Sequence, residues 1–294
     1  WHLAPGGGIS ALDLSSPPPE IEFDDRTFMV YETIRDRVRV VAHAYEVLPD
    51  GRLGRGGFLE LVIDEALTTV SEARWLTPES PFENELLVLT DEVRTLLLHP
   101  VGDEIETVPF DDTAVSLAAR LDPAPPPRIN HSGAYGLRGA LDGDVAVVFW
   151  SFNVRDSVPI EVVAEISLTT GTLLSEPRWL GGSCLTPNEV VSHPGGGVDI
   201  VRQPRTNCVL GERDYLYNTP HPLEVHVGMR RPIDFSEAAP LRLGAGAYAL
   251  NVRIARDGDR LVIVWTESGP ATLPDVIGRQ RIVESLIYAI LECD

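Results

Sequence analysis

The chain contains two closely similar runs in which a polar turn leads into a block of apolar residues. Asp142–Trp150 reads Asp-Gly-Asp-Val-Ala-Val-Val-Phe-Trp, and Asp257–Trp265 reads Asp-Gly-Asp-Arg-Leu-Val-Ile-Val-Trp. Asp-Gly tolerates the positive backbone angles of a two-residue hairpin turn. An apolar run without polar alternation is typical of a strand that is covered on both faces. Each run therefore predicts a hairpin followed by a central strand that ends in a buried tryptophan.

Weaker versions of the same run recur along the chain. The last residues of the five copies stand at positions 31, 90, 150, 202 and 265. A second phrase is also repeated, because Ser-Glu-Ala-Arg-Trp-Leu at 71–76 is echoed by Ser-Glu-Pro-Arg-Trp-Leu at 175–180. A period of this length fits a sheet of about four strands that buries both faces against its neighbours. We therefore expect an all-β chain that forms a β-propeller of about five four-stranded blades, with two β-sandwich domains as the alternative.

The period also predicts the domain organisation. The repeats would span residues 21–76, 77–127, 128–183, 184–243 and 244–294. They would form a single propeller domain over residues 21–294, because the repeat continues across the proline-rich segment at 123–127. Residues 1–20 would be an N-terminal segment, and the alternating run at 9–14 is our candidate for a strand that closes the ring. A disordered tail is the alternative for this segment.

Two segments predict further strands. At 38–44 apolar residues alternate with residues of a more solvent-exposed face, which indicates an outer or third strand of the first repeat. Residues 281–291 fit an amphipathic helix when read alone, but their alignment with the third repeat favours a strand.

The charge balance restricts the partners. The chain has 44 acidic residues against 24 basic ones, a formal net charge of -20, and every basic residue is arginine, since the sequence contains no lysine. Such a field repels nucleic acid and anionic membrane surfaces. No apolar run reaches the roughly 20 residues that a membrane-spanning helix needs. We expect no nucleic-acid partner and no membrane span.

The three cysteines suggest one disulfide. Cys184 and Cys208 lie in neighbouring loop-rich segments, so we expect them to form a bridge, which would imply an oxidising compartment. Cys293 would remain unpaired or join another chain. We therefore expect an extracellular, periplasmic or cell-surface protein.

No motif identifies a catalytic residue, a metal site or a cofactor. His221 and His226 share a repeat with His193, Asp214 and Glu224, but their spacing matches no recognised metal site. A histidine of this kind next to proline is typical of a plain surface residue. The chain also lacks a Gly-x-Ser-x-Gly nucleophile turn, a phosphate loop and a haem-attachment motif.

Aromatic side chains are the better binding candidates. Trp150 and Trp265 end apolar strands, so we expect both to pack between sheets. Trp75 and Trp179 stand among charged residues and are candidates for a binding surface. The least regular repeat, 184–243, adds further candidates because irregular loops on a regular scaffold often carry function. These binding candidates are Tyr215, Tyr217, His221 and His226.

The phrase Asp-Gly-Asp-x-x-Val-x-Val-Trp, best preserved in the third and fifth repeats, resembles the repeats of secreted bacterial β-propeller proteins. The sialidase-type Asp box, Ser-x-Asp-x-Gly-x-Thr-Trp, is missing. A strong scaffold without a catalytic signature favours a non-enzymatic propeller that binds a protein or a glycan, or that serves as a subunit of a cell-surface assembly. The alternative is a glycoside-active enzyme whose carboxylates meet in the axial funnel. A third hypothesis is assembly with other chains through exposed sheet edges.

Overall fold

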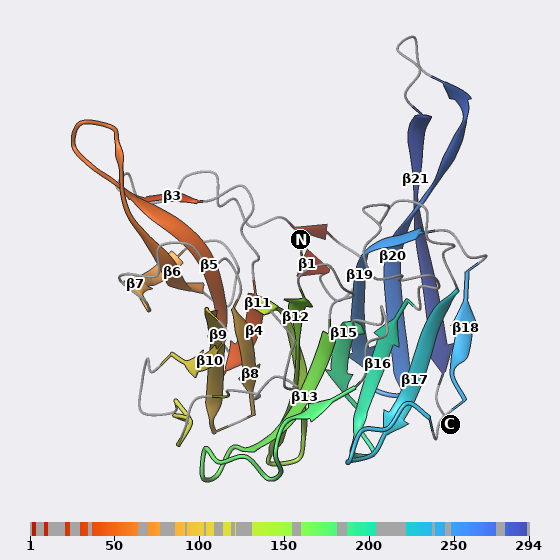
Figure 1. Cartoon of the computed structure of the whole chain (residues 1–294). Coiled ribbons are helices and arrows are strands. Elements are labelled where there is room, and N and C mark those ends of the chain that lie inside the picture. Colours follow the sequence, from red (N-terminus) through yellow and green to blue (C-terminus); the bar gives the residue numbers. More distant parts are fainter. Residues whose placement is uncertain are drawn as a thin grey trace. The chain divides into compact units, whose positions relative to one another are not determined.

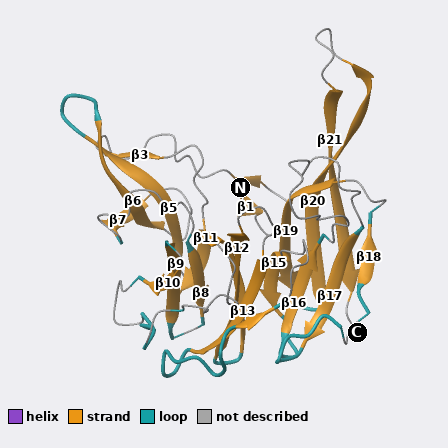
Figure 2. Ribbon diagram, in the orientation of Figure 1, coloured by secondary structure: helices purple, strands orange, loops and turns teal. Residues whose placement is uncertain are grey.

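In the computed structural model the chain is all-β, and the part of it that the structure describes contains strands and turns but no helix (Figures 1 and 2). The described residues are 2–3, 9–10, 21–23, 30–34, 37–63, 70–76, 86–91, 93–102, 104–108, 114–118, 121, 131–154, 160–180, 187–203, 222–236, 239–244, 248–274 and 280–292. No helix that could cross a membrane occurs among them.

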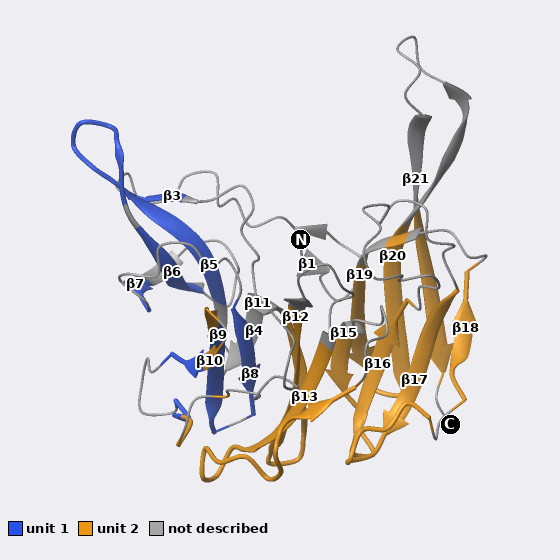
Figure 3. Ribbon diagram, in the orientation of Figure 1, with its two compact units in different colours: residues 1–99, 106–116 blue, residues 100–105, 117–294 orange. Residues whose placement is uncertain are grey.

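The chain divides into two compact units, coloured in Figure 3. The first comprises residues 1–99 and 106–116, and the second comprises residues 100–105 and 117–294. The single domain at 21–294 and the five repeat boundaries stay predictions.

Besides the short pair of β1 (His2–Leu3) and β2 (Ile9–Ser10) described below, two antiparallel sheets lie mainly in the first unit, and residues 100–105 of the second of them belong to the second unit. The first sheet has the order β3-β5-β6-β7, and β4 also pairs with β5. Its strands are β3 (Ile21–Phe23), β4 (Val30–Ile34), β5 (Arg37–Val47), β6 (Leu53–Ile63) and β7 (Val70–Trp75). The second sheet has the order β10-β9-β8, with β8 (Leu87–Thr90), β9 (Thr95–Val101) and β10 (Glu104–Thr107). A core of Val41, Phe58, Val88, Leu97 and Val108 joins the two sheets.

The second unit contains three antiparallel sheets whose strands follow the order of the sequence. The third sheet consists of β11 (His131–Asp142), β12 (Val145–Val154), β13 (Ile160–Ser167) and β14 (Arg178–Trp179). The fourth sheet consists of β15 (Pro187–Ser192), β16 (Val198–Arg202), β17 (Leu223–Met229) and β18 (Leu241–Leu243). The fifth sheet consists of β19 (Tyr248–Asp257), β20 (Arg260–Pro274) and β21 (Gln280–Glu292).

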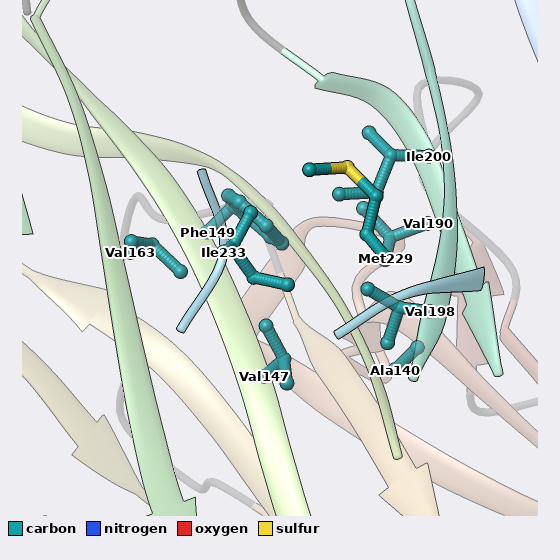
Figure 4. Close-up of a cluster of buried hydrophobic side chains, with 9 residues drawn as sticks. All are labelled: Ala140, Val147, Phe149, Val163, Val190, Val198, Ile200, Met229 and Ile233. Carbon is teal, nitrogen blue, oxygen red and sulfur yellow. The ribbon is translucent and has the colours of Figure 1, made fainter. Parts of the chain in front are cut away.

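The fourth sheet lies between the third and the fifth. On one face, Val198 and Ile200 pack with Val147 and Phe149 of β12, in the cluster of nine buried side chains drawn in Figure 4. On its other face, Val201 and Val225 pack with residues of the fifth sheet that include Leu261, Ile263 and Trp265. Since neighbouring strand residues point to opposite faces, an unbroken apolar run is what a doubly covered strand requires.

The hairpins and central strands predicted from the two best copies are confirmed. Asp142 pairs with Val145 across a turn whose Gly143 has φ of 64°, and Asp257 pairs with Arg260 across a turn whose Gly258 has φ of 56°. β12 and β20 each lie inside their sheets, and Trp150 and Trp265 are buried as expected. The segment 281–291 is a strand, within β21.

Two strand assignments in the first unit are wrong. β4 and β8, which carry the weak copies ending at Tyr31 and Thr90, are not central, because β5 and β9 take that position. The segment at 38–44 lies in β5, which is the third strand of the predicted first repeat in chain order, but it is not an outer strand, since β5 pairs with β4 on one side and β6 on the other. In both repeats the weak copy of the apolar run therefore lies one strand before the inner strand.

The N-terminal segment is described at four residues only. β2 (Ile9–Ser10) pairs with β1 (His2–Leu3) in a separate two-stranded sheet. Its role in closing a ring stays a prediction.

Candidate functional site

The first strands of the three sheets in the second unit lie next to one another. β11 contacts β15, and β15 contacts β19. This arrangement brings side chains from three sheets to one place, which we call the first-strand cluster: Arg138 of β11, Glu189 of β15 and Arg253 of β19.

Glu189 is the carboxyl group of this cluster. Its side chain is 19% exposed, and Oε1 accepts a hydrogen bond of 2.5 Å from Nη1 of Arg253. Burial raises the pKa of Glu189 above its usual value, against the opposing effects of the Arg138 and Arg253 guanidinium groups. A carboxyl group in this balance can hold a proton at higher pH than an ordinary glutamate, and the arginines stabilise the anion once the proton leaves.

A second group of polar side chains lies between the third and fourth sheets. We call it the buried cluster: Glu161 of β13, Arg202 of β16, Glu224 and His226 of β17, and Phe235. Their register places them on the facing sides of the two sheets, because Glu161 pairs with Ser151, Arg202 with Glu224, and His226 with Ile200.

Arg202 is the centre of the buried cluster. Its Nε and Nη2 donate to Oε2 of Glu224 at 3.1 and 2.9 Å, and its guanidinium carbon lies 4.0 Å from the centroid of the Phe235 ring. The ring of His226 meets the same phenyl group edge-on, with 5.1 Å between centroids. A buried charge is stabilised by such hydrogen bonds and by contact with an aromatic face.

Burial shifts the two titratable neighbours of this ion pair in opposite directions. Burial raises the pKa of Glu161 to about 9, although the nearby Arg202 charge opposes the shift. Burial also lowers the pKa of His226 to about 4, and the Arg202 charge adds to that effect while Glu224 opposes it. Near neutrality both groups are uncharged, so the cluster holds one ion pair and two neutral polar groups.

A deviation from the repeat signals this cluster in the sequence. Arg202 ends the apolar run of the fourth copy, at the position that Trp150 and Trp265 occupy in the third and fifth. The Arg202 and Trp265 side chains face the preceding sheet, and Trp150 occupies the corresponding face of its own sheet. An arginine in place of a core tryptophan needs a buried counter-charge, which Glu224 supplies.

Polar contacts also join the hairpin ends of the sheets. Asp142 accepts hydrogen bonds from the backbone N–H of Gly197 at 2.7 Å and from Nε of Arg231 at 2.7 Å. The Gly197 hydrogen bond is the main cause that holds the pKa of Asp142 below its usual value. Burial opposes this shift, and the hydrogen bond and charge of Arg231 add to it. The Asp-Gly-Asp turn therefore also ties the third sheet to the fourth.

A matching contact joins the fourth sheet to the fifth. Asp199 is fully buried, and it accepts hydrogen bonds from the backbone N–H of Gly228 at 2.8 Å and from Nε of Arg256 at 2.6 Å. Nδ1 of His193 lies 2.9 Å from Asp199 Oδ1. These contacts give polar partners to Asp199 and His193, which explains how these two polar residues are accommodated between the fourth and fifth sheets.

The structure places three of the six candidate binding residues. Trp75 ends β7 in the first unit and pairs with Leu59, while Trp179 of β14 pairs with Val162 in the second unit. Both are partly buried, and the Trp179 ring lies 6.0 Å from that of Phe152, on the face of the third sheet opposite to Glu161. His226 is a buried residue of a strand, so its interpretation as a plain surface histidine on a loop is wrong. Tyr215, Tyr217, His221 and the cysteines Cys184, Cys208 and Cys293 lie outside the described residues.

The repeated phrase itself has a shared structure. In the first unit Glu60 pairs with Arg74 and Leu76 donates to the carbonyl of Phe58; in the second unit Val163 pairs with Arg178 and Leu180 donates to the carbonyl of Glu161. Both phrases thus add the last strand to a sheet in the same register. Among the residues that the structure describes, no cluster of side chains could hold a metal ion.

No protein-family model and no curated protein matches the chain. Among solved structures, an ulvan lyase described as a new family of polysaccharide lyase is 10% identical with a TM-score of 0.45, and the match covers 90% of this chain and 70% of that one. An endo-arabinase from Bacteroides thetaiotaomicron is 10% identical with a TM-score of 0.43, over 90% of this chain and 93% of that one. A glycosyl hydrolase from Bacteroides ovatus is 9% identical with a TM-score of 0.35, over 90% and 84%.

These similar structures correct the functional expectation. These proteins are a polysaccharide lyase, an endo-arabinase and a glycosyl hydrolase, which agrees with the glycoside-active alternative and not with the non-enzymatic binding protein that the sequence favours. TM-scores below 0.5 at about 10% identity assign neither an activity nor a substrate to this chain.

Proposed function

We propose that this protein is a glycan-active enzyme in which Glu189 donates a proton to the oxygen of the glycosidic bond that breaks. The observation that carries the proposal is the position of Glu189. Its side chain is partly exposed, its pKa is raised by burial, and Arg253 of the neighbouring first strand donates to it at 2.5 Å. Among the described carboxyl groups Glu161 also has a raised pKa, but it is buried between two sheets, where a glycan cannot reach it.

The chemistry follows from this balance of burial and charge. Breaking a glycosidic C–O bond leaves an alkoxide unless a proton reaches the departing oxygen, and a carboxylic acid at this place supplies it. Glu189 then becomes a carboxylate, which Arg253 and Arg138 stabilise. The same proton donation serves hydrolysis, where water adds to the anomeric carbon, and elimination, where the sugar loses a C–H proton to a base.

We further propose that the five sheets are blades of one β-propeller with the first strands nearest the axis. The contacts of β11 with β15 and of β15 with β19 support this arrangement, as does the stacking of the third, fourth and fifth sheets. In a propeller the first-strand cluster would face the axial funnel. A disulfide between Cys184 and Cys208 and an extracellular or periplasmic location remain part of the proposal.

The test is turnover of a broad panel of neutral and acidic polysaccharides. New reducing ends would report cleavage, and ultraviolet absorbance of unsaturated sugars would separate elimination from hydrolysis. We expect at least one substrate, and we expect Glu189→Gln to lose about 10²- to 10⁴-fold in kcat, as removal of a general acid does. Glu292→Gln, which changes an exposed glutamate of β21, is the matched control and should retain activity. No turnover across the panel, or full activity of Glu189→Gln, would refute the proposal.

The pH profile gives a second readout of the same role. Arg253→Gln removes a hydrogen bond and a charge that both lower the pKa of Glu189, so the alkaline limb of kcat/KM should move to higher pH. Arg260→Gln, at an exposed arginine of β20, should leave that limb in place. A shift in the opposite direction would show that Glu189 is not the proton donor.

A further inference from the structure

The first strands of the third, fourth and fifth sheets carry a charged residue at one equivalent position. In each sheet this residue pairs with the one that directly precedes Trp150, Arg202 or Trp265, the last residues of the repeated runs. The three pairs are Arg138 with Phe149, Glu189 with Val201, and Arg253 with Val264. A register shift comes immediately before each pair. Irregularities of this kind re-aim a side chain and are common next to active sites, so this position differs from the regular strand around it.

Arg253 uses only one of its nitrogens for contacts within the described part of the protein. Its Nη1 donates to Oε1 of Glu189 at 2.5 Å and to the backbone carbonyl of Val252 at 2.9 Å. No described residue accepts a hydrogen bond from Nε or Nη2, and the side chain is 60% exposed. The edge formed by Nε and Nη2 can pair with a carboxylate or a sulfate through two parallel hydrogen bonds.

Arg138 adds a second positive charge on the other side of Glu189. Its strand β11 contacts β15, as β19 does, and the charges of Arg138 and Arg253 both act on the Glu189 carboxyl group. Two guanidinium groups stand here against one carboxyl group, so the first-strand cluster has a net positive charge whether or not Glu189 holds its proton.

The overall charge of the chain has little weight at this place. The formal net charge is -20, but at physiological ionic strength salt screens charges that lie more than about 8 Å apart. The nearest charges then decide which ligand is attracted, and at the first-strand cluster these are the two arginines.

We propose that the glycan is anionic and that the Nε and Nη2 edge of Arg253 binds a carboxylate or sulfate group on a sugar next to Glu189, with Arg138 as the second positive charge. This rests on the proposed function, because it names the substrate class of the same site. A neutral sugar offers only hydroxyl groups to this edge. Hydrogen bonds between a guanidinium group and an anion are about twice as strong as those between neutral groups, so the edge selects an anionic sugar.

The test is equilibrium binding of oligosaccharides, measured by titration calorimetry at about 0.15 M salt. The Glu189→Gln variant is used, so that the probes are not consumed. The probes are uronic acid oligosaccharides, the same compounds with their carboxyl groups reduced to alcohols, and sulfated galactose oligosaccharides with their desulfated forms. We expect a uronic acid or a sulfated probe to bind about tenfold or more tightly than its neutral counterpart, and the pair that shows this difference identifies the anionic group.

A second substitution in the same background tests Arg253 itself. Arg253→Gln should raise the Kd of the anionic probe about tenfold or more and leave that of the neutral probe unchanged. Arg253→Lys keeps the charge but loses the two parallel donors, so it should recover only part of the affinity. Arg260→Gln, at a 59% exposed arginine of the same sheet, is the matched control and should bind as the background does. Circular dichroism should show that all the variants remain folded.

Equal or tighter binding of the neutral probes would overturn this proposal, and so would the failure of every anionic probe to bind. Unchanged affinity of Arg253→Gln for the anionic probe would overturn it as well. The proposed function fails in a different way. An anionic probe that binds but is not cleaved by the unmodified protein would contradict proton donation by Glu189, whereas cleavage of neutral polysaccharides alone would leave that role intact and contradict the anionic substrate.

Discussion

Replacement of Glu161 by glutamine should stabilise the protein in a pH-dependent way. Glu161 is 3% exposed, and burial raises its pKa from 4.5 to about 9. Above pH 4.5 the unfolded chain releases this proton while the folded protein keeps it. The folded state then binds more protons than the unfolded one, so the free energy of unfolding falls as pH rises.

The magnitude follows from the difference between the two pKa values. Each unit of pH above the unfolded value costs about 1.4 kcal/mol, so at about pH 7 the penalty is about 3 kcal/mol. Glutamine has nearly the same shape and no charge, and it therefore removes this penalty. The gain of Glu161→Gln over the unmodified protein should be near zero at about pH 4 and approach about 3 kcal/mol at neutrality.

Urea unfolding at several pH values between 4.5 and 9 measures this gain. The informative quantity is the change with pH in the difference between variant and unmodified protein, because glutamine also adds an amide group whose cost does not depend on pH. Ser151→Ala, at the buried cross-strand partner of Glu161, is a control that changes no titratable group and should give a constant difference. A difference that stays flat for Glu161→Gln would refute the raised pKa and its cause.

Two further predictions concern neighbouring parts of the second unit. Burial lowers the pKa of His226 to about 4, so the unfolded chain gains a proton below pH 6.5 that the folded protein does not, and stability should fall as pH drops from 6.5 to 4. His226→Gln should recover up to about 3 kcal/mol at the acid end in urea unfolding, and equal acid sensitivity of the variant would contradict this. Gly197→Ala should destabilise by about 2 kcal/mol or more, since φ is +88° and a Cβ would lie 2.5 Å from the Met229 carbonyl oxygen. Gly143→Ala, with φ of +64° and open space around it, should cost only about 1 kcal/mol, and thermal unfolding of both variants measures the two losses. Equal losses would show that the close approach at Gly197 is unimportant.

The sequence predicts the second unit better than the first. Asp-Gly followed by a long apolar run ending in Trp combines turn chemistry with burial of both faces, and both copies form the expected hairpin and inner strand. In the first unit no Asp-Gly stands directly before β5 or β9, and the Asp50-Gly51 turn precedes a different inner strand, β6. The weak copies of the apolar run there fall on the short strands β4 and β8, whereas β5 and β9 are inner strands.

The candidate site was harder to predict for a physical reason. Glu189, Arg138 and Arg253 come from strands of three different sheets, and no local pattern records which first strands will touch. The buried cluster did leave a signal, because Arg202 breaks the run that ends in tryptophan elsewhere. Aromatic and histidine residues are more conspicuous binding candidates in the sequence than this replaced position.

The contact of Asp142 with Gly197 limits how such repeats can be rearranged. Asp142 closes its own hairpin and also depends on the backbone N–H of a glycine in the following sheet. A sheet transplanted to another place in the series would lose that donor unless its new neighbour presented a glycine with the same left-handed backbone. The sheets of this protein are therefore not interchangeable modules. Chimaeras that swap them should keep the hairpin at 193–197 together with the Asp-Gly-Asp turn to which its Gly197 N–H donates.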